Sequence, residues 1–230
     1  MKIGFQGLDI QEGKTRYTDA KVSKLVEKFS SSKVSFYFFE FVGSDYIKTD
    51  TIAVSTEKLL DFLILDMEKI ETRINNTTDE KEKQVLQKCL QNLEKEVPLC
   101  DVEFQEPELS ILRALAPLSL KPTLIIEDKN IQINVLIEKV LKKSNSIFFY
   151  TAAKKEVKAW LVKKDSRVIE CAGKIHSDLA RGFIKAEVIN FADFEDCHNM
   201  NDAKSKGLVK LVDKDYLVRD GDILDIKFNV

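Results

Sequence analysis

The clearest pattern of apolar and polar positions lies between residues 57 and 97. Apolar side chains recur there at helical spacing in two series that are separated by the polar stretch 75–80. The series are Leu59, Leu63, Met67, Ile70 and Ile74, then Leu86, Leu90, Leu93 and Val97. Thr77, followed three residues later by Glu80, has the form of a capping box that starts the second helix. The pattern predicts an antiparallel helical hairpin, because the connection is too short for any other arrangement.

The rest of the chain alternates between strand-like and helix-like patterns. Apolar, β-branched or aromatic runs predict strands at 2–6, 34–42, 123–126, 146–151, 157–162, 183–191 and 223–230, with shorter ones at 208–212 and 216–218. Helical spacing predicts helices at 18–29, 107–115, 133–141 and 168–179, with a short helical turn at 203–206. Thr18 or Asp19 is expected to cap the first of these helices, and Ser166 the fourth. The series predicts an α/β chain, α+β overall, that ends in a compact β-grasp arrangement.

Composition places the chain among ordinary globular proteins. Hydrophobic residues make up 44% and charged residues 32%, and the formal net charge is -2, which gives no overall attraction to nucleic acid or membrane. The N-terminus lacks a signal-like apolar region, and no window approaches the ~20 apolar residues of a membrane span. We therefore expect a cytoplasmic protein whose four cysteines are reduced.

Several segments resemble, in order, the YchF / Obg-like ATPase family. The run 172–188, the strand 148–152 and the last stretch, 214–230, are similar to the C-terminal TGS domain of that family. Residues 57–97 resemble its inserted hairpin, and Lys121-Pro122-Thr123 its Leu-Lys-Pro segment. The resemblance implies a Ras-like nucleotide-binding core before the TGS region, with ribosome-associated function.

The phosphate loop implied by the resemblance is altered. Such a loop has the form Gly-x-x-x-x-Gly-Lys-Ser/Thr, because backbone amides wrap one phosphate group while the lysine reaches the next. Gly7 and Gly13, followed by Lys14 and Thr15, stand one residue too far apart and enclose two carboxylates, Asp9 and Glu12. A vestigial nucleotide site of Gly7, Gly13, Lys14 and Thr15 remains an alternative, and it would bind GTP or ATP with Mg²⁺.

Two further nucleotide motifs of the family are missing. Gly43 stands where the metal-linked aspartate of switch II belongs, and Asp45 is out of register. The base-reading asparagine position falls near Asp128. Because phosphoryl transfer depends on positioning by these parts, we expect no NTP hydrolysis, no catalytic residues and no cofactor.

The remaining candidate chemistry is a basic stretch within residues 154–185, which holds nine basic side chains against four acidic ones. Trp160 and Phe183 lie among them. Such a stretch is either a phosphate-binding surface or a solvated charged face. Lys174, His176, Arg181 and Lys185 are the candidate RNA- or partner-binding residues, and His176 is either a surface contact or a helix cap. Two isolated histidines and scattered cysteines predict no metal site.

We therefore expect three parts. Residues 1–56 and 98–145 form a degenerate, reduced Ras-like α/β core, residues 57–97 an inserted helical hairpin, and residues 146–230 a TGS-like β-grasp domain. The expected function is a non-catalytic binding module for RNA or the ribosome. The alternatives are the vestigial nucleotide site and a protein-only adaptor that acts through the acidic hairpin.

Overall fold

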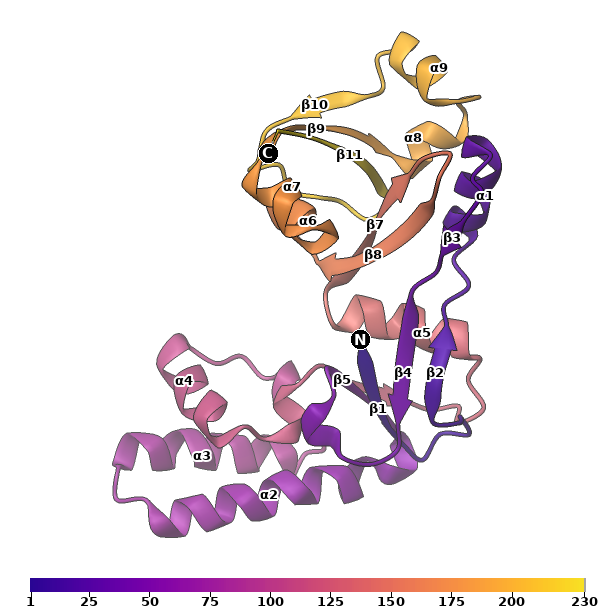
Figure 1. Cartoon of the computed structure of the whole chain (residues 1–230). Coiled ribbons are helices and arrows are strands. Elements are labelled where there is room, and N and C mark those ends of the chain that lie inside the picture. Colours follow the sequence, from indigo (N-terminus) through magenta and orange to yellow (C-terminus); the bar gives the residue numbers. More distant parts are fainter. Residues whose placement is uncertain (230) are drawn as a thin grey trace. The chain divides into compact units, whose positions relative to one another are not determined.

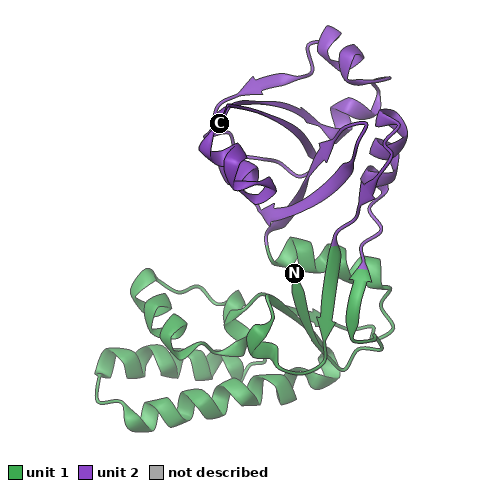
Figure 2. Cartoon of the chain, viewed as in Figure 1, with its two compact units in different colours: residues 1–15, 38–144 green, residues 16–37, 145–230 purple. Residues whose placement is uncertain are grey.

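The computed structural model describes residues 1–229, so Val230, the end of the last predicted strand, lies outside the described residues. The chain divides into two compact units, each with its own sheet (Figures 1 and 2). Unit 1 contains residues 1–15 and 38–144, and unit 2 contains residues 16–37 and 145–230. The fold class is mixed α/β, as the sequence predicts.

Unit 1 is built on a five-stranded sheet in the order β2-β4-β1-β5-β6. The strands are β1 (Lys2–Gln6), β2 (Gly13–Arg16), β4 (Phe38–Val42), β5 (Thr51–Ser55) and β6 (Thr123–Ile126). β1 pairs in parallel with β4 and β5, and β5 with β6. β5 was not predicted, although every one of its residues is buried. Its run of five residues is short, and periodicity alone does not identify a strand that is buried on both faces.

The predicted hairpin is present as α2 (Leu59–Asn76) and α3 (Glu80–Leu93). Their apolar faces share a core with Ile52 and Val54 of β5 and with Leu112 of α4 (Glu106–Leu115), so the hairpin is continuous with unit 1. The predicted capping box is wrong. Asp79 is the N-cap of α3 and accepts hydrogen bonds from the Lys81 and Glu82 amides. Thr77 lies outside the helix and donates to Glu82 instead.

Asp66, near the middle of α2, fixes the chain that follows α4. Its side chain is 1% exposed and accepts hydrogen bonds from the backbone amides of Leu118 and Ser119, at 2.6 and 2.7 Å. These residues start the 3-10 turn η4 (Leu118–Leu120), which leads into β6. A buried carboxylate satisfies backbone donors here that would otherwise be lost to water.

Residues 16–37 belong to unit 2, although the sequence places all of 1–56 in the first core. This segment, which we call the strap, contains α1 (Ala20–Phe29) and β3 (Val34–Ser35). α1 contacts β7 (Ser146–Ala152) and β8 (Val157–Lys163), and β3 pairs with β8. Asp19 caps α1, as predicted, by accepting a hydrogen bond from the Lys21 amide.

Unit 2 has a six-stranded sheet in the order β10-β9-β11-β7-β8-β3. β9 (Phe183–Asn190) pairs antiparallel with β10 (Lys210–Val212) on one side and with β11 (Asp222–Phe228) on the other. One face of this sheet packs against α6 (Val168–Ile175) through Val168 and Cys171. The strap covers part of the opposite face. The short helices α8 (Phe191–Glu195) and α9 (Met200–Ser205) follow β9.

The helix predicted at 168–179 is two helices, α6 and α7 (Ser177–Arg181), which join at His176. Ser166 does not cap α6; the Glu170 carboxylate instead accepts a hydrogen bond from the Arg167 amide at the start of the helix. The predicted strand at 216–218 is a single bridge between Arg167 and Leu217. α5 (Ile133–Lys143) matches its prediction closely and belongs to unit 1.

Leu63→Ala tests the hairpin core. Leu63 is fully buried, so its truncation leaves a cavity and should lower the free energy of unfolding by about 2–5 kcal/mol in chemical denaturation. Leu60→Ala, on the same helix, is the matched control because Leu60 is 46% exposed, and its effect should stay below about 1 kcal/mol. Equal losses of unfolding free energy in both variants would contradict the burial of Leu63 in the core that α2 shares with the rest of unit 1.

Candidate functional site

The carboxyl ends of parallel strands are where α/β sheets usually bind ligands, and in unit 1 this edge holds Gln6, Gly7, Gly43 and Ser55. Gly7 has a φ of +71°, and a Cβ built on it would lie 2.2 Å from Ser55 Oγ. Only glycine therefore fits at the end of β1. Gln6 Oε1 and Ser55 Oγ are buried and have no hydrogen-bond partner within the described residues.

The four residues of the vestigial nucleotide site, Gly7, Gly13, Lys14 and Thr15, do not form one continuous phosphate-binding loop. Gly13, Lys14 and Thr15 lie in strand β2, at the edge of the sheet, whereas Gly7 ends β1. The next helix, α1, begins five residues after Thr15 and belongs to unit 2. A phosphate loop instead places its glycines at the start of a helix whose N-terminal amides and dipole attract the anion.

The loop between β1 and β2 makes its own internal contacts. The Asp9 amide donates to the Lys129 carbonyl and the Ile10 amide to the Leu8 carbonyl, both at 2.9 Å. Leu8 is buried. These amides are directed toward carbonyl oxygens of the chain, so they do not form an open nest for an anion.

Glu12 lies beside Gly43, and Gly43 is the residue that stands at the position expected for the switch II aspartate. Its Oε1 accepts a hydrogen bond of 2.7 Å from the Gly43 amide, and a Cβ on Gly43 would lie 2.4 Å from that oxygen. The Tyr46 hydroxyl donates to the carbonyls of Phe5 and Gly43. Burial, together with the negative charge of Glu12, raises the pKa of Tyr46. The Gly43 amide therefore already donates its hydrogen bond to a carboxylate of the protein, that of Glu12.

The two other altered motifs have local structural roles. Asp45, in the left-handed region with φ 54°, forms an ion pair with Lys48. Asp128 accepts a hydrogen bond from the Asn130 amide and so stabilises the turn after β6. Lys121, from the predicted Lys-Pro segment, donates to the carbonyls of Tyr46, Ile47 and Thr49 at 2.6–2.7 Å. Burial lowers the pKa of Lys121.

The four candidate binding residues of unit 2 occupy consecutive elements: Lys174 on α6, His176 at the α6–α7 junction, Arg181 on α7 and Lys185 on β9. α7 contacts both α6 and β9, so these elements are neighbours. Arg181 forms an ion pair with Asp178 at 3.0 Å, and Lys185 with Asp213 at 3.7 Å. The basic patch defined by these four residues is therefore partly neutralised by acids of the same unit.

The two aromatic residues of the basic stretch are partly buried and pack against the core of unit 2. Trp160 stacks on Phe149 with ring centroids 6.2 Å apart, and its Nε1 donates to Thr151 Oγ1. Lys158 Nζ lies 3.7 Å from the centre of the Trp160 ring, in a cation–π contact. Phe183 packs on the same core. The Trp160 ring therefore already contacts Phe149 and Lys158.

His176 caps a helix, which is one of the two roles that the sequence left open. Its Nδ1 accepts a hydrogen bond from the Asp178 amide at 3.1 Å, in the N-cap position of α7. The side chain is otherwise exposed. This contact accounts for the break between α6 and α7, because an extended residue separates them.

Sequence reasoning missed the polar contacts that join the strap to the rest of unit 2, of which one is buried and one exposed. The Tyr150 hydroxyl donates a 2.5 Å hydrogen bond to Asp19, and burial raises the pKa of Tyr150 strongly, with the Asp19 charge adding to it. Lys21 forms an ion pair with Asp220, whose other oxygen accepts from the Phe148 amide. These partners are at least 72 residues apart, so local pattern carries no signal of them.

Neither a metal cluster nor a membrane-spanning helix is found in the described chain. Among residues 1–229, no group of three histidine, cysteine, aspartate or glutamate side chains is placed to hold a metal ion. Within the same range, no helix is long and apolar enough to cross a membrane.

The arrangement defines a class: an α/β protein with one unit whose sheet has four parallel strands and which carries a helical hairpin, joined to a second unit with its own mixed sheet. A family model for the C-terminal part of YchF GTPases, described as a protein of unknown function (DUF933), matches residues 147–229. The solved structure of the Schizosaccharomyces pombe YchF GTPase aligns over 99% of this chain and 97% of that one, with a TM-score of 0.79. At 15% sequence identity this likeness shows the fold.

Curated relatives give the same family. The Ribosome-binding ATPase YchF of Mycoplasma genitalium is 43% identical over 98 residues, which are 43% of this chain and 27% of the relative. The protein of that name from Bacillus subtilis is 28% identical, with 74% of this chain and 65% of the relative covered. The chain thus covers less than two thirds of either relative. These relatives and the family model of residues 147–229 show similarity to YchF and Obg-like ATPases.

Replacement of His176 tests its cap. His176→Ala removes the acceptor for the Asp178 amide and should lower the free energy of unfolding by about 0.5–2 kcal/mol, measured by denaturant titration. His176→Asn retains a capping oxygen and should lose less. Identical losses for the two variants would show that the cap contributes nothing.

Proposed function

We propose that this protein is a non-catalytic binding module that associates with RNA or the ribosome in the cytoplasm. Similarity to relatives that are named ribosome-binding ATPases supports the association. The whole-chain activity of those relatives is not carried over, because the nucleotide motifs differ. The proposal therefore separates binding, which it retains, from NTP hydrolysis, which it does not.

The part of the proposal that excludes NTP hydrolysis rests on one observation. Gly13, Lys14 and Thr15 lie in strand β2. Phosphoryl transfer requires a lysine and a backbone cradle held at the same phosphate groups. Here the lysine is on an edge strand, and Glu12 accepts the Gly43 amide hydrogen bond. A carboxylate at that donor repels an incoming phosphate and competes with it for the same hydrogen.

The binding half rests on the basic patch of unit 2. Lys174, Arg181 and Lys185 lie on three neighbouring elements, and the side chain of Arg181 is 70% exposed. Exposed ion pairs are weak, on the order of 1 kcal/mol or less, so a polyanion can displace Asp178 and Asp213 from their partners. Phosphate contacts of this kind position a nucleic acid without reading its sequence.

Two alternatives have specific observations in their favour. Exposed Leu60, Ile64 and Leu65 on α2 favour a protein partner bound through the hairpin. The unpartnered Gln6 Oε1 and Ser55 Oγ favour a polar ligand at the carboxyl edge, such as GTP or ATP with Mg²⁺. Ribosome binding and nucleotide assays on matched variants distinguish these alternatives from the proposal.

Charge reversal tests the patch. The triple variant Lys174→Glu, Arg181→Glu and Lys185→Glu should weaken co-sedimentation with ribosomes at low salt. It should also reduce the salt slope of log affinity by about 0.7–0.9 for each phosphate group that the protein no longer neutralises. Asp178→Asn releases Arg181 from its ion pair and should strengthen binding.

The matched control reverses three exposed lysines of unit 1, Lys81, Lys95 and Lys139, and so changes the net charge equally. It should bind like the parent. If both triple variants lose the same affinity, general charge explains the effect and the patch is not a site. If neither loses affinity while substitution of Leu60 and Ile64 does, the hairpin is the binding surface.

Nucleotide assays test the non-catalytic half. The purified chain should show no ATP or GTP turnover above background with Mg²⁺, and Lys14→Ala should leave nucleotide binding unchanged, measured by calorimetry. Lys139→Ala is the matched control. Turnover or binding that disappears in Lys14→Ala but persists in the control would establish the vestigial nucleotide site instead.

A further inference from the structure

The sheet of unit 2 contains a gap that the proposed function does not use. Within the described residues, β11 pairs with its central neighbour β7 only at Ile223 and Tyr150, although it pairs with β9 along its whole length. Beyond that bridge the two strands separate. A cavity of about 560 Å³ opens there and is lined by Thr151 and Ala152 of β7 and by Leu224, Asp225, Ile226 and Phe228 of β11.

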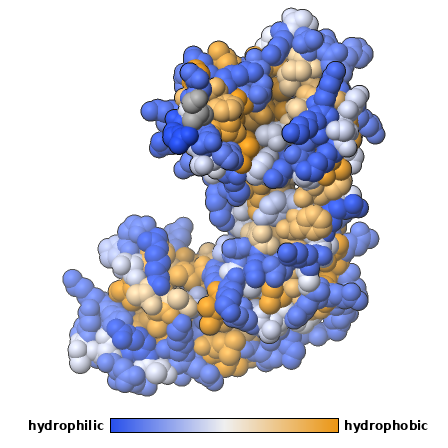
Figure 3. Space-filling view, in the orientation of Figure 1, coloured by the Kyte–Doolittle hydropathy of each residue, from blue (hydrophilic) through white to orange (hydrophobic). Residues whose placement is uncertain are grey.

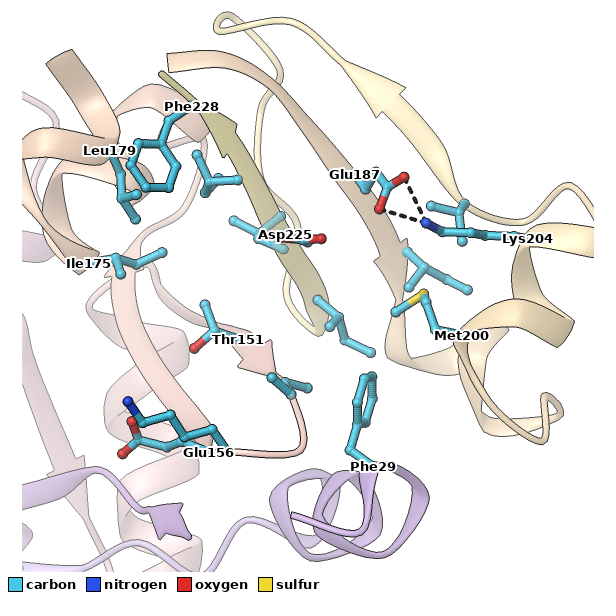
Figure 4. A pocket seen from close by; sticks show the side chains of 18 residues that line it. Phe29, Thr151, Glu156, Ile175, Leu179, Glu187, Met200, Lys204, Asp225 and Phe228 are labelled. Atoms are coloured by element: carbon cyan, nitrogen blue, oxygen red, sulfur yellow. Dashed lines mark hydrogen bonds and ion pairs between the residues drawn. The ribbon is translucent and has the colours of Figure 1, made fainter. Parts of the chain in front are cut away.

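The cavity runs through the sheet, because its walls come from both faces (Figure 4). Ile175 and Leu179 of α6 and α7 line one side, where the α6 face lies. Phe29 of the strap and Met200 of α9 line the other. Figure 3 shows apolar surface on this unit bordered by hydrophilic side chains. We call this cavity the strand gap.

The β11 side of the strand gap presents backbone groups that the β9 ladder does not use. The Phe191 amide donates to the Gly221 carbonyl at 2.8 Å. This bond identifies which residues of β11 form hydrogen bonds with β9 and which face away from it. In the observed register Ile223, Asp225 and Lys227 then exchange bonds with β9, while Leu224 and Ile226 direct their N–H and C=O groups the other way. The Leu224 N–H serves the bridge to Tyr150, so the C=O of Leu224 and the N–H and C=O of Ile226 are left beyond that bridge. Strand donors and acceptors of this kind are a template for another strand.

Charged groups in the strand gap are largely paired with each other. Glu187 accepts from Lys204 at 2.9 Å, as Figure 4 shows, and Asp225 accepts from Lys227 at 2.6 Å. Lys155, in the turn after β7, lines the cavity and makes no ion pair in the part of the chain that the structure describes. The chemistry left for an occupant is backbone hydrogen bonding, apolar contact on two faces and one positive charge.

We propose that the strand gap binds an extended peptide, which adds to the free edge of β11. The edge Leu224–Phe228 accommodates about four residues at ~3.3 Å each. Alternate side chains of that peptide point to Ile175 and Leu179 on one face and to Phe29 and Met200 on the other, so the peptide is apolar at consecutive positions. An acidic residue of the peptide pairs with Lys155. This proposal does not depend on the RNA- or ribosome-binding function.

The test uses the full chain and a phage-displayed library of random peptides. Enriched sequences should contain a short apolar run next to an acidic residue. Ile226→Pro removes the N–H that faces the strand gap, which the β9 ladder does not use, together with the isoleucine side chain, and should weaken an enriched peptide at least about tenfold. Ile226→Ala shortens the side chain but keeps the N–H, and should weaken the peptide less. Lys155→Glu should weaken acidic peptides selectively.

Several results would overturn the proposal. They are a library without enrichment, enriched peptides that bind the Pro and Ala variants equally, and displacement of the peptide by a single-stranded RNA oligonucleotide, which would make the strand gap an RNA site. If Ile226→Pro does not fold, amide hydrogen exchange of the parent decides. Added peptide should slow exchange at Ile226 and leave Asp225 unchanged, and an unchanged Ile226 would contradict strand addition.

Discussion

The structure depends on the covering of the unit 2 sheet by the strap. Val22 and Leu25 of α1 are fully buried, and the Tyr150–Asp19 hydrogen bond closes the contact from within the apolar layer. A sheet face of this size left open would expose apolar area at a cost of roughly 25 cal/mol per Å². Helix α1 therefore packs within unit 2. It cannot start directly after Gly13 and Lys14, as the helix of a phosphate loop does.

The arrangement at the carboxyl ends of the unit 1 strands follows from the packing of α1 within unit 2. Without a helix to start, the loop after β1 continues into strand β2, and its amides bond to carbonyls within the unit. Glu12 then lies at the Gly43 amide. Substitutions that looked independent along the sequence, the long glycine spacing, the enclosed carboxylates and Gly43 itself, thus form one connected arrangement.

Unit 2 combines two surfaces of different chemistry. The basic patch offers cations on α6, α7 and β9, partly held by acids, whereas the strand gap offers backbone groups and apolar walls. α7 contributes Arg181 to the first surface and Leu179 to the second, so the two surfaces adjoin on this helix.

The sequence by itself determined the elements whose pattern is local. The hairpin, α5, β7 and β8 were predicted from apolar spacing, and the family was recognised from short motifs. Of the site, it identified the altered nucleotide motifs and the basic residues, but neither the ion pairs of Arg181 and Lys185 nor the burial of Trp160. Tertiary structure alone decided that residues 16–37 join unit 2, that Glu12 lies at Gly43, and that β11 leaves β7 after one bridge. Each of these depends on partners far apart in the chain, and periodicity reports which face of an element is apolar without reporting which other element covers it.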